Sequence, residues 1–195
     1  MDSFKLASSC IRPSGADRIT LARGVYRLVR WSPPPVNWRK INVNACWRRN
    51  FLCGNIGIVV RDSYSGCNVV RSVRVHAFTI EMVEALAVLE GCLLANNLQL
   101  LEVVIESDAQ VIMRSLNSLS LSCDWDLFPN LIPVLEIGRS FQSCSWSWVL
   151  RATNRAADFV ARNISPEMCG FSWVVRPPSS LVGILNKDGL PCPPL

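Results

Sequence analysis

The sequence predicts an α/β fold in which a mixed five-stranded sheet is flanked by helices. Three strand-like segments come first, at residues 40–46, 54–61 and 67–78, and their succession predicts an antiparallel meander. Strands and helices alternate after them, so the complete order is β-β-β-α-β-α-α-β-α. A length of 195 residues suits one such domain with additional segments at its ends.

A proline-rich joint from Trp31 to Trp38 marks the start of the predicted domain. Consecutive prolines favour an extended chain and cannot continue a helix or a central strand. We therefore predict a poorly ordered leader at residues 1–30 and one domain at residues 31–165. Residues 166–195 are rich in proline, which predicts an irregular C-terminal tail.

The stretch from Leu101 to Gln110 is the most informative part of the chain. Leu101, Val103 and Ile105 alternate with Glu102, Val104 and Glu106, which predicts a strand, and the apolar spacing of residues 111–116 then predicts a helix. Asp108 therefore stands at the carboxyl end of a strand, where active-site groups of open α/β sheets gather. The alternative is that Asp108 only caps the helix by accepting hydrogen bonds from free backbone N–H groups.

Glu84 lies on the helix predicted before this strand, which Thr79 can cap and which runs to about Asn97. It shares a face with small residues, including Ala87 and Gly91, that would let the helix approach the sheet closely. Its carboxylate would then point toward the sheet edge. The alternative is a favourable interaction with the helix dipole near the N-terminus.

Asp158 lies on the last predicted helix, at residues 151–162. A helix at about residues 124–141, made irregular by Pro129 and Pro133, and a strand at residues 143–150 come before it. Taken alone, Asp158 could be an ordinary solvated acid on a helix surface.

The composition restricts the classes of function. The net charge of +5 and the pI near 8.8 favour an acidic partner such as nucleic acid or a membrane surface. The nine cysteines never lie within four residues of one another, which excludes C-x-x-C zinc knuckles and predicts buried free thiols. A single histidine, His76, excludes histidine-rich metal sites.

No apolar run reaches the roughly 18 residues needed to span a bilayer, so we predict no membrane partner. Free cysteines favour an intracellular location, in the nucleus or cytoplasm. An organellar transit peptide is an alternative reading of the arginine-rich residues 1–30. Nothing in the sequence identifies a protein partner.

Five motifs follow one another along the chain. Their residues are Trp31, Pro33, Pro34, Trp38, Lys40, Asn42 and Val43, then Gly57, Arg61, Asp62 and Gly66, then Glu84, Ala87 and Gly91, then Glu106, Ser107 and Asp108, and finally Arg151, Asn154, Ala157, Asp158 and Ala161. In this order the motifs resemble the ribonuclease H family, over about residues 31–190. The resemblance is closest to plant type-1 ribonuclease H-like domains related to non-LTR retrotransposon proteins.

The resemblance implies an enzyme that cleaves the RNA strand of an RNA–DNA hybrid. In that family four acids hold two divalent cations, Mg²⁺ or Mn²⁺, which activate the nucleophile and stabilise the leaving oxygen. Carried over by position, the catalytic and metal-binding residues would be Asn44, Glu84, Asp108 and Asp158.

Two of the positions depart from the family pattern. Asn44 replaces the first acid, and losing one unit charge about 4 Å from a cation is worth about 4 kcal/mol, or about a thousandfold in rate. Trp148 replaces a histidine ten residues before the last acid, and an indole cannot shuttle a proton at neutral pH.

We therefore expect a ribonuclease H-like domain that binds nucleic acid, with weak or lost catalysis. An active two-metal hybrid ribonuclease is one alternative, and a transposon-derived relic with a structural or protein-interaction role is another. Arg48 and Arg49, which follow the first strand, are candidates for binding phosphate, although they could equally be a solvated turn.

Overall fold

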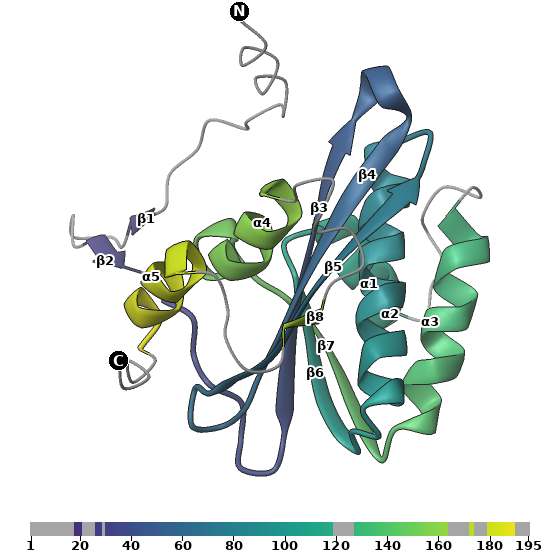
Figure 1. Cartoon of the computed structure of the whole chain (residues 1–195). Coiled ribbons are helices and arrows are strands. Elements are labelled where there is room, and N and C mark those ends of the chain that lie inside the picture. The colour runs from purple at the N-terminus through teal and green to yellow at the C-terminus, as the bar shows by residue number, and fades with distance from the viewer. Residues whose placement is uncertain are drawn as a thin grey trace, which may run out of the picture.

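The computed structural model describes residues 18–20, 26–28, 30–118, 127–163, 172–173 and 179–189. One mixed sheet runs through the domain in the strand order β7-β6-β3-β4-β5-β8 (Figure 1). β3, β4 and β5 form the predicted antiparallel meander, while β6 and β7 lie parallel to β3. The strand bounds are β3 Arg39–Arg48, β4 Cys53–Arg61, β5 Cys67–His76, β6 Glu102–Ser107, β7 Ser143–Trp148 and β8 Ser172–Trp173.

The five predicted strands are thus confirmed, and the two-residue β8 extends the edge of the sheet beside β5. Helices cover both faces, with α1, α2 and α3 on one side and α4 and α5 on the other (Figure 1). Their bounds are α1 Ile80–Asn97, α2 Gln110–Ser118, α3 Phe128–Ser140, α4 Arg155–Arg162 and α5 Ser179–Lys187.

Local sequence signals account for several helix ends. Thr79 caps α1 as predicted, because its hydroxyl accepts a hydrogen bond from the backbone N–H of Met82 at 3.2 Å. The last predicted helix is divided: a 3-10 turn covers Arg151–Thr153, and α4 begins only after Asn154. The predicted start of the helix near residue 124 lies outside the described residues, and α3 begins at Phe128.

The two faces of the sheet carry two separate hydrophobic cores. Ile41 and Val43 point into the larger core, where they pack against α1 together with residues of α2 and α3. The opposite face of the sheet carries a smaller core in which Val59 contributes from β4 and Leu181 and Leu185 contribute from α5. Because α5 buries two leucines there, it is an integral part of the fold.

The prediction of an irregular tail at residues 166–195 is therefore wrong for residues 179–187, which are helical. Leu181 and Leu185 are four residues apart and give α5 an apolar face that closes over the sheet. In the predicted leader, β1 Arg18–Thr20 and β2 Tyr26–Leu28 form a separate two-stranded antiparallel sheet. The rest of residues 1–29 lies outside the described residues.

A buried guanidinium ties both ends of the domain to the sheet. Arg61 is fully buried, donates to Asn42 Oδ1 at 2.8 Å and forms an ion pair with Asp188 at 2.8 Å. Its guanidinium also lies 3.6 Å from the ring centroid of Trp31. Trp31, before β3, and Asp188, after α5, therefore both contact the buried guanidinium of Arg61.

The cysteines in the described parts agree with the prediction only in part. Cys53 and Cys92 are buried free thiols, whereas Cys67 and Cys144 are free thiols that are only partly buried. Burial raises the pKa of Cys67 to about 11, which keeps that thiol protonated at neutral pH. In the described parts of the chain, no helix has the length and apolar character needed to cross a membrane.

Candidate functional site

The fold brings the four predicted site positions to one region at the end of β6. Asn44 lies in the middle of β3 and faces α4, while Asp108 follows the last residue of β6. β3 and β6 pair in parallel up to Asn42 and Glu106. Asn44 and Asp108 each follow two residues later, so they lie at the same height along the two strands. Asp158 lies on α4 and is in direct contact with Asn44.

Gly57 explains why α4 can approach β3 so closely. It pairs with Asn44 across the β3–β4 ladder, and a Cβ atom at this position would collide with the backbone of Ala157 and Ala161. Because Gly57 has no side chain, the helix rests directly on the sheet and carries Asp158 to Asn44.

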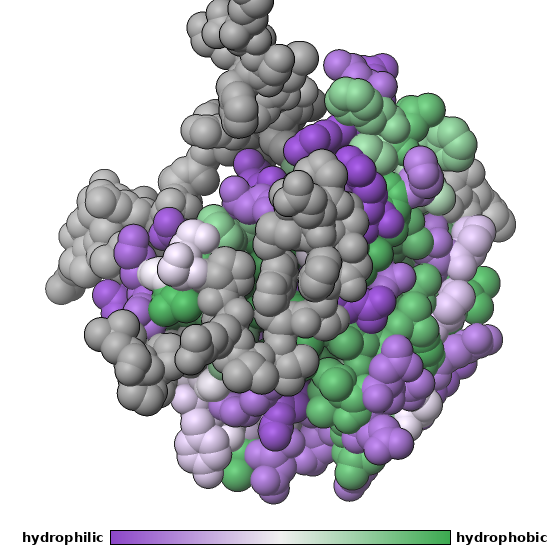
Figure 2. All heavy atoms as spheres, viewed as in Figure 1, coloured by the Kyte–Doolittle hydropathy of each residue, from purple (hydrophilic) through white to green (hydrophobic). Residues whose placement is uncertain are grey.

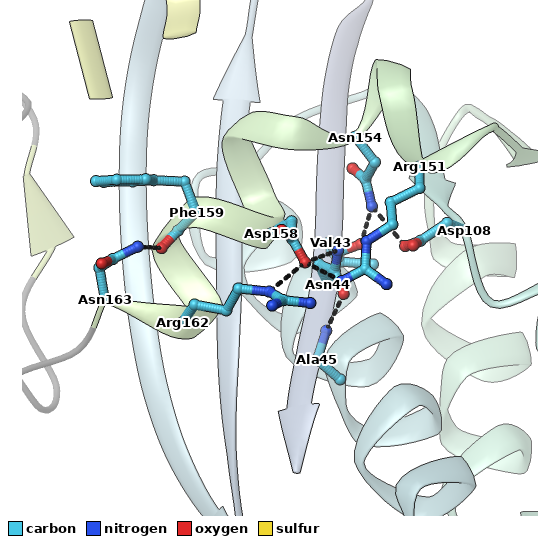
Figure 3. Close-up of polar contacts among 10 residues, drawn as sticks. All are labelled: Val43, Asn44, Ala45, Asp108, Arg151, Asn154, Asp158, Phe159, Arg162 and Asn163. Atoms are coloured by element: carbon cyan, nitrogen blue, oxygen red, sulfur yellow. Dashed lines mark hydrogen bonds and ion pairs between the residues drawn. The ribbon is translucent and has the colours of Figure 1, made fainter. Parts of the chain in front are cut away.

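Asp158 Oδ1 is the most heavily engaged atom of the site (Figure 3). It accepts hydrogen bonds from Arg151 Nη2 at 2.6 Å, from Arg162 Nε at 2.8 Å and from Asn44 Nδ2 at 3.4 Å. Figure 3 shows Arg162 reaching back along α4 and Arg151 reaching across from the 3-10 turn. Two cations of the chain itself therefore neutralise the fourth predicted acid.

Asn44 also directs its carbonyl oxygen to the protein. Its Oδ1 accepts a hydrogen bond from the backbone N–H of Ala45 at 2.6 Å. Its amide nitrogen is the group that points at Asp158. Asn44, at the position where the family has an acid, thus donates a hydrogen bond to Asp158 and turns its carbonyl oxygen toward the backbone of Ala45.

Asn154 links the start of α4 to the strands. Its buried side-chain amide donates to Asp108 Oδ1 and to the carbonyl oxygen of Val43, both at 2.9 Å. One amide group therefore fixes the distance between α4, β3 and the end of β6. This contact is visible at the upper right of Figure 3.

The charges of the site are coupled. Burial and, after it, the charges of Asp108 and Glu81 raise the pKa of Glu84 to about 7, while the charge of Arg151 opposes them. Burial also raises the pKa of Asp108 above its ordinary value, while the hydrogen bond from Asn154 and the charge of Arg151 lower it. Arg151 is therefore the cation that Glu84, Asp108 and Asp158 share.

The donor chemistry does not fit the pair of divalent cations that the resemblance implies. The oxygen of Asp158 nearest Asn44 is taken by two guanidinium groups, and the oxygen of Asn44 is taken by a backbone N–H. Among the described residues, no group of three or more histidine, cysteine, aspartate or glutamate side chains is arranged to hold a metal ion. In this arrangement Asn44 Oδ1, Asp108 Oδ1 and Asp158 Oδ1 each already accept a hydrogen bond from the protein.

Trp148 borders the acids at the end of β7. Its indole N–H donates to the backbone carbonyl oxygen of Asp108 at 3.3 Å, and 45% of its surface is exposed. The residue that replaces the expected histidine thus lies next to the site.

Sequence reasoning assigned no role to Arg151, Asn154 or Arg162. Arg151 and Asn154 belong to the last motif of the resemblance, but the motif does not say what they contact. Arg162 follows Asp158 by four residues, a spacing that places both on one helix face and could have predicted their ion pair.

Arg48 and Arg49 lie away from the acids, at the tip of the β3–β4 hairpin. Both are exposed, and four residues of strand, roughly 13 Å, separate Arg48 from Asn44. Phe51 beside them is 70% exposed, and hydrophobic residues gather at this tip in Figure 2. The two arginines are accessible, as binding of phosphate would require.

Residues 42–164 match the family model described as reverse transcriptase-like. The chain belongs to this reverse transcriptase-like family. The matched residues include all four predicted acid positions, Trp148, Arg151 and Arg162, and they exclude Arg30 and α5. A search of curated proteins finds no match.

Solved structures show that this member of the family has the ribonuclease H fold. Ribonuclease H1 of Halobacterium salinarum is similar at a TM-score of 0.60 and 21% identity, over 64% of this chain and 94% of that one. The N-terminal RNase H domain of a Mycobacterium tuberculosis protein gives 0.59 and 20%, over 65% and 91%. LC11-RNase H1, solved with an RNA/DNA hybrid, gives 0.55 and 18%, over 63% and 92%.

Proposed function

We propose that this protein is a ribonuclease H-like domain that binds nucleic acid, with RNA–DNA hybrid as its preferred form, and that metal-dependent cleavage is weak or lost. The observation that carries the proposal is the engagement of Asp158 Oδ1 by Arg151, Arg162 and Asn44. A divalent cation could bind that oxygen only after at least one guanidinium had moved away.

Binding is supported independently of catalysis. A neighbour with the same fold was solved with an RNA/DNA hybrid, and another, a foamy viral protease-reverse transcriptase, with double-stranded DNA. The net charge of +5 favours a polyanion, and Arg48 and Arg49 stand exposed at the hairpin tip. Binding of this kind needs only a positively charged surface, so it does not depend on the acids of the candidate site.

Two changes in the site oppose the two-metal reaction, because Asn44 carries no charge and Trp148 cannot transfer a proton. Arg151, which belongs to the family motif, forms an ion pair with Asp158 at 2.6 Å. Glu84 and Asp108 are retained, and burial raises the pKa of both carboxyl groups. The motif resemblance further supports descent from a plant non-LTR retrotransposon.

The test is one hybrid duplex, labelled on its RNA strand, followed for both binding and cleavage. We expect the purified full chain to bind the hybrid more tightly than duplex DNA of the same sequence. With Mg²⁺ or Mn²⁺, we expect no cleavage above that of an Asp108→Asn control. Cleavage that this substitution abolishes would favour the active ribonuclease, and failure to bind either duplex would favour a structural or protein-interaction role.

A further inference from the structure

A basic pocket is lined by residues from the start of α4 and the end of α5. These two helices lie on the sheet face opposite α1 and α3 (Figure 1). Its volume is about 380 Å³. Three separate segments of the chain contribute cations to its lining, namely Arg30, Arg155 and Lys187. Ala152 and Ile184 add apolar wall.

The pocket carries a net positive charge. Its one acid, Asp188, turns its carboxylate to the buried Arg61 at 2.8 Å, and its side chain is only 7% exposed. Arg30, Arg155 and Lys187 are exposed, and none of them forms an ion pair with any residue in the described parts of the chain. Three cations therefore share one hollow, with the charge of its only acid already neutralised.

Each of the three cations is adjacent in sequence to a residue whose side chain contacts the interior of the domain. Arg30 precedes Trp31, which stacks on Arg61, and Lys187 precedes Asp188, which pairs with the same guanidinium. Arg155 follows Asn154, whose amide bonds Asp108 and the Val43 carbonyl. The backbone positions of the cations are thus fixed before any ligand arrives, which lowers the entropic cost of binding.

A second hollow adjoins this pocket at Arg30, which lines both. Its volume is about 280 Å³, and Trp148 and Thr153 also line it. Its one acid, Glu106, forms an ion pair with Lys40 at 2.8 Å. An exposed indole, which donates to the backbone of Asp108, and the three cations therefore border two hollows that meet at Arg30. An aromatic platform beside a row of cations is the pattern that binds a nucleic-acid strand.

We propose that Arg30, Arg155 and Lys187 form a phosphate-binding pocket for the backbone of a nucleic-acid strand whose neighbouring part lies over Trp148. This inference rests on the proposed function and extends it to a site that the family match does not include, because Arg30 and Lys187 lie outside residues 42–164. Lys187, the last residue of α5, would thereby add a phosphate contact to the ribonuclease H fold.

The experiment measures the affinity of the full chain for an RNA–DNA hybrid by fluorescence anisotropy, between about 50 and 200 mM salt. The variants are Arg30→Gln, Arg155→Gln and Lys187→Gln, singly and together. Arg139→Gln is the matched control, because it removes the same charge from an exposed residue of α3 on the other face of the sheet. The three positions are on separate segments, so a folding defect in one variant, detected by circular dichroism, leaves the other two informative.

We expect each pocket variant to weaken binding about fivefold and to lower the slope of log affinity against log salt by about one, with Arg139→Gln unchanged. Wild-type binding that none of the three variants alters would overturn the pocket and leave the proposed function standing. Absence of wild-type hybrid binding would overturn both. Unaltered hybrid binding, together with inorganic phosphate that stabilises the wild type but not the triple variant, would assign the pocket to a small anion instead and overturn its nucleic-acid role.

Discussion

The guanidinium of Arg151 lies 2.6 Å from the carboxylate of Asp158, and its charge also lowers the pKa of Glu84 and Asp108. One side chain thus balances all three acids that the resemblance assigns to metal binding. Arg162 adds a second cation to Asp158 at 2.8 Å. The site is therefore an internally compensated cluster of charges.

Replacing Arg151 should change the titration of the remaining acids. Arg151→Gln removes the positive charge that lowers the pKa of Glu84 and Asp108, so both pKa values should rise. Arg162→Gln is the control, because it breaks a similar ion pair with Asp158, whereas Arg151 is the cation that lowers the pKa of both other acids. Carbon-13 NMR titration of the carboxyl groups measures the difference. Equal shifts in the two variants would contradict a specific role for Arg151.

The raised pKa of Glu84 makes stability depend on pH. The pKa is about 7 in the folded protein and near 4.5 when unfolded, so the folded state binds the proton more tightly. The stability gained from this proton is complete below about pH 4.5 and is lost as pH rises through 7. Urea unfolding at several pH values should show a loss of up to about 3 kcal/mol that Glu84→Gln removes. Parallel curves for the wild type and the variant would refute this coupling.

The buried pair of Arg61 and Asp188 should be essential for stability. Burial lowers the pKa of Arg61, and Asp188 counteracts that effect, so Asp188→Ala would leave an uncompensated buried cation at a cost of about 3–5 kcal/mol. Glu90→Ala breaks the half-exposed pair with Arg71 at 3.8 Å and should cost less than about 1 kcal/mol. Chemical denaturation of both variants provides the comparison. Similar losses in the two would mean that the buried pair is no stronger than a surface pair.

Gly57 should be intolerant of a methyl group. Gly57→Ala would press against the backbone of Ala157 and Ala161, push α4 from the sheet and cost about 1–3 kcal/mol or more. Gly183 in α5 has no atom within 4 Å of an added Cβ, so Gly183→Ala should be neutral or stabilising by up to about 1 kcal/mol. Melting temperatures distinguish the two variants. A neutral Gly57→Ala would show that the close contact between α4 and the sheet is unnecessary.

Sequence patterns were sufficient for much of the fold. The alternation of residues 101–107, the Thr79 cap and the succession of three strands predicted β6, α1 and the meander, because these signals are local. The motif spacing also identified Asn44, Glu84, Asp108 and Asp158, which the structure brings to one region. Their roles as ligands or catalysts stay predictions.

Contacts between distant residues explain what sequence reasoning missed. Arg61 and Asp188 are 127 residues apart, and neither residue alone signals that α5 docks beside β4. Leu181 and Leu185 do have helical spacing, but the prolines around them favoured an irregular tail. The engagement of Asp158 by Arg151 depends on the 3-10 turn before α4, which no periodicity predicts.

We propose that Arg151, Arg162 and the side-chain amide of Asn44 keep divalent cations from binding at Asp158. Isothermal titration of the purified protein with Mn²⁺ tests it directly. We predict no saturable binding by the wild type, and saturable binding by the double variant Asn44→Asp, Arg151→Gln, which restores a carboxylate and removes the competing guanidinium. Saturable binding of Mn²⁺ by the wild type that Asp158→Asn abolishes would contradict the account.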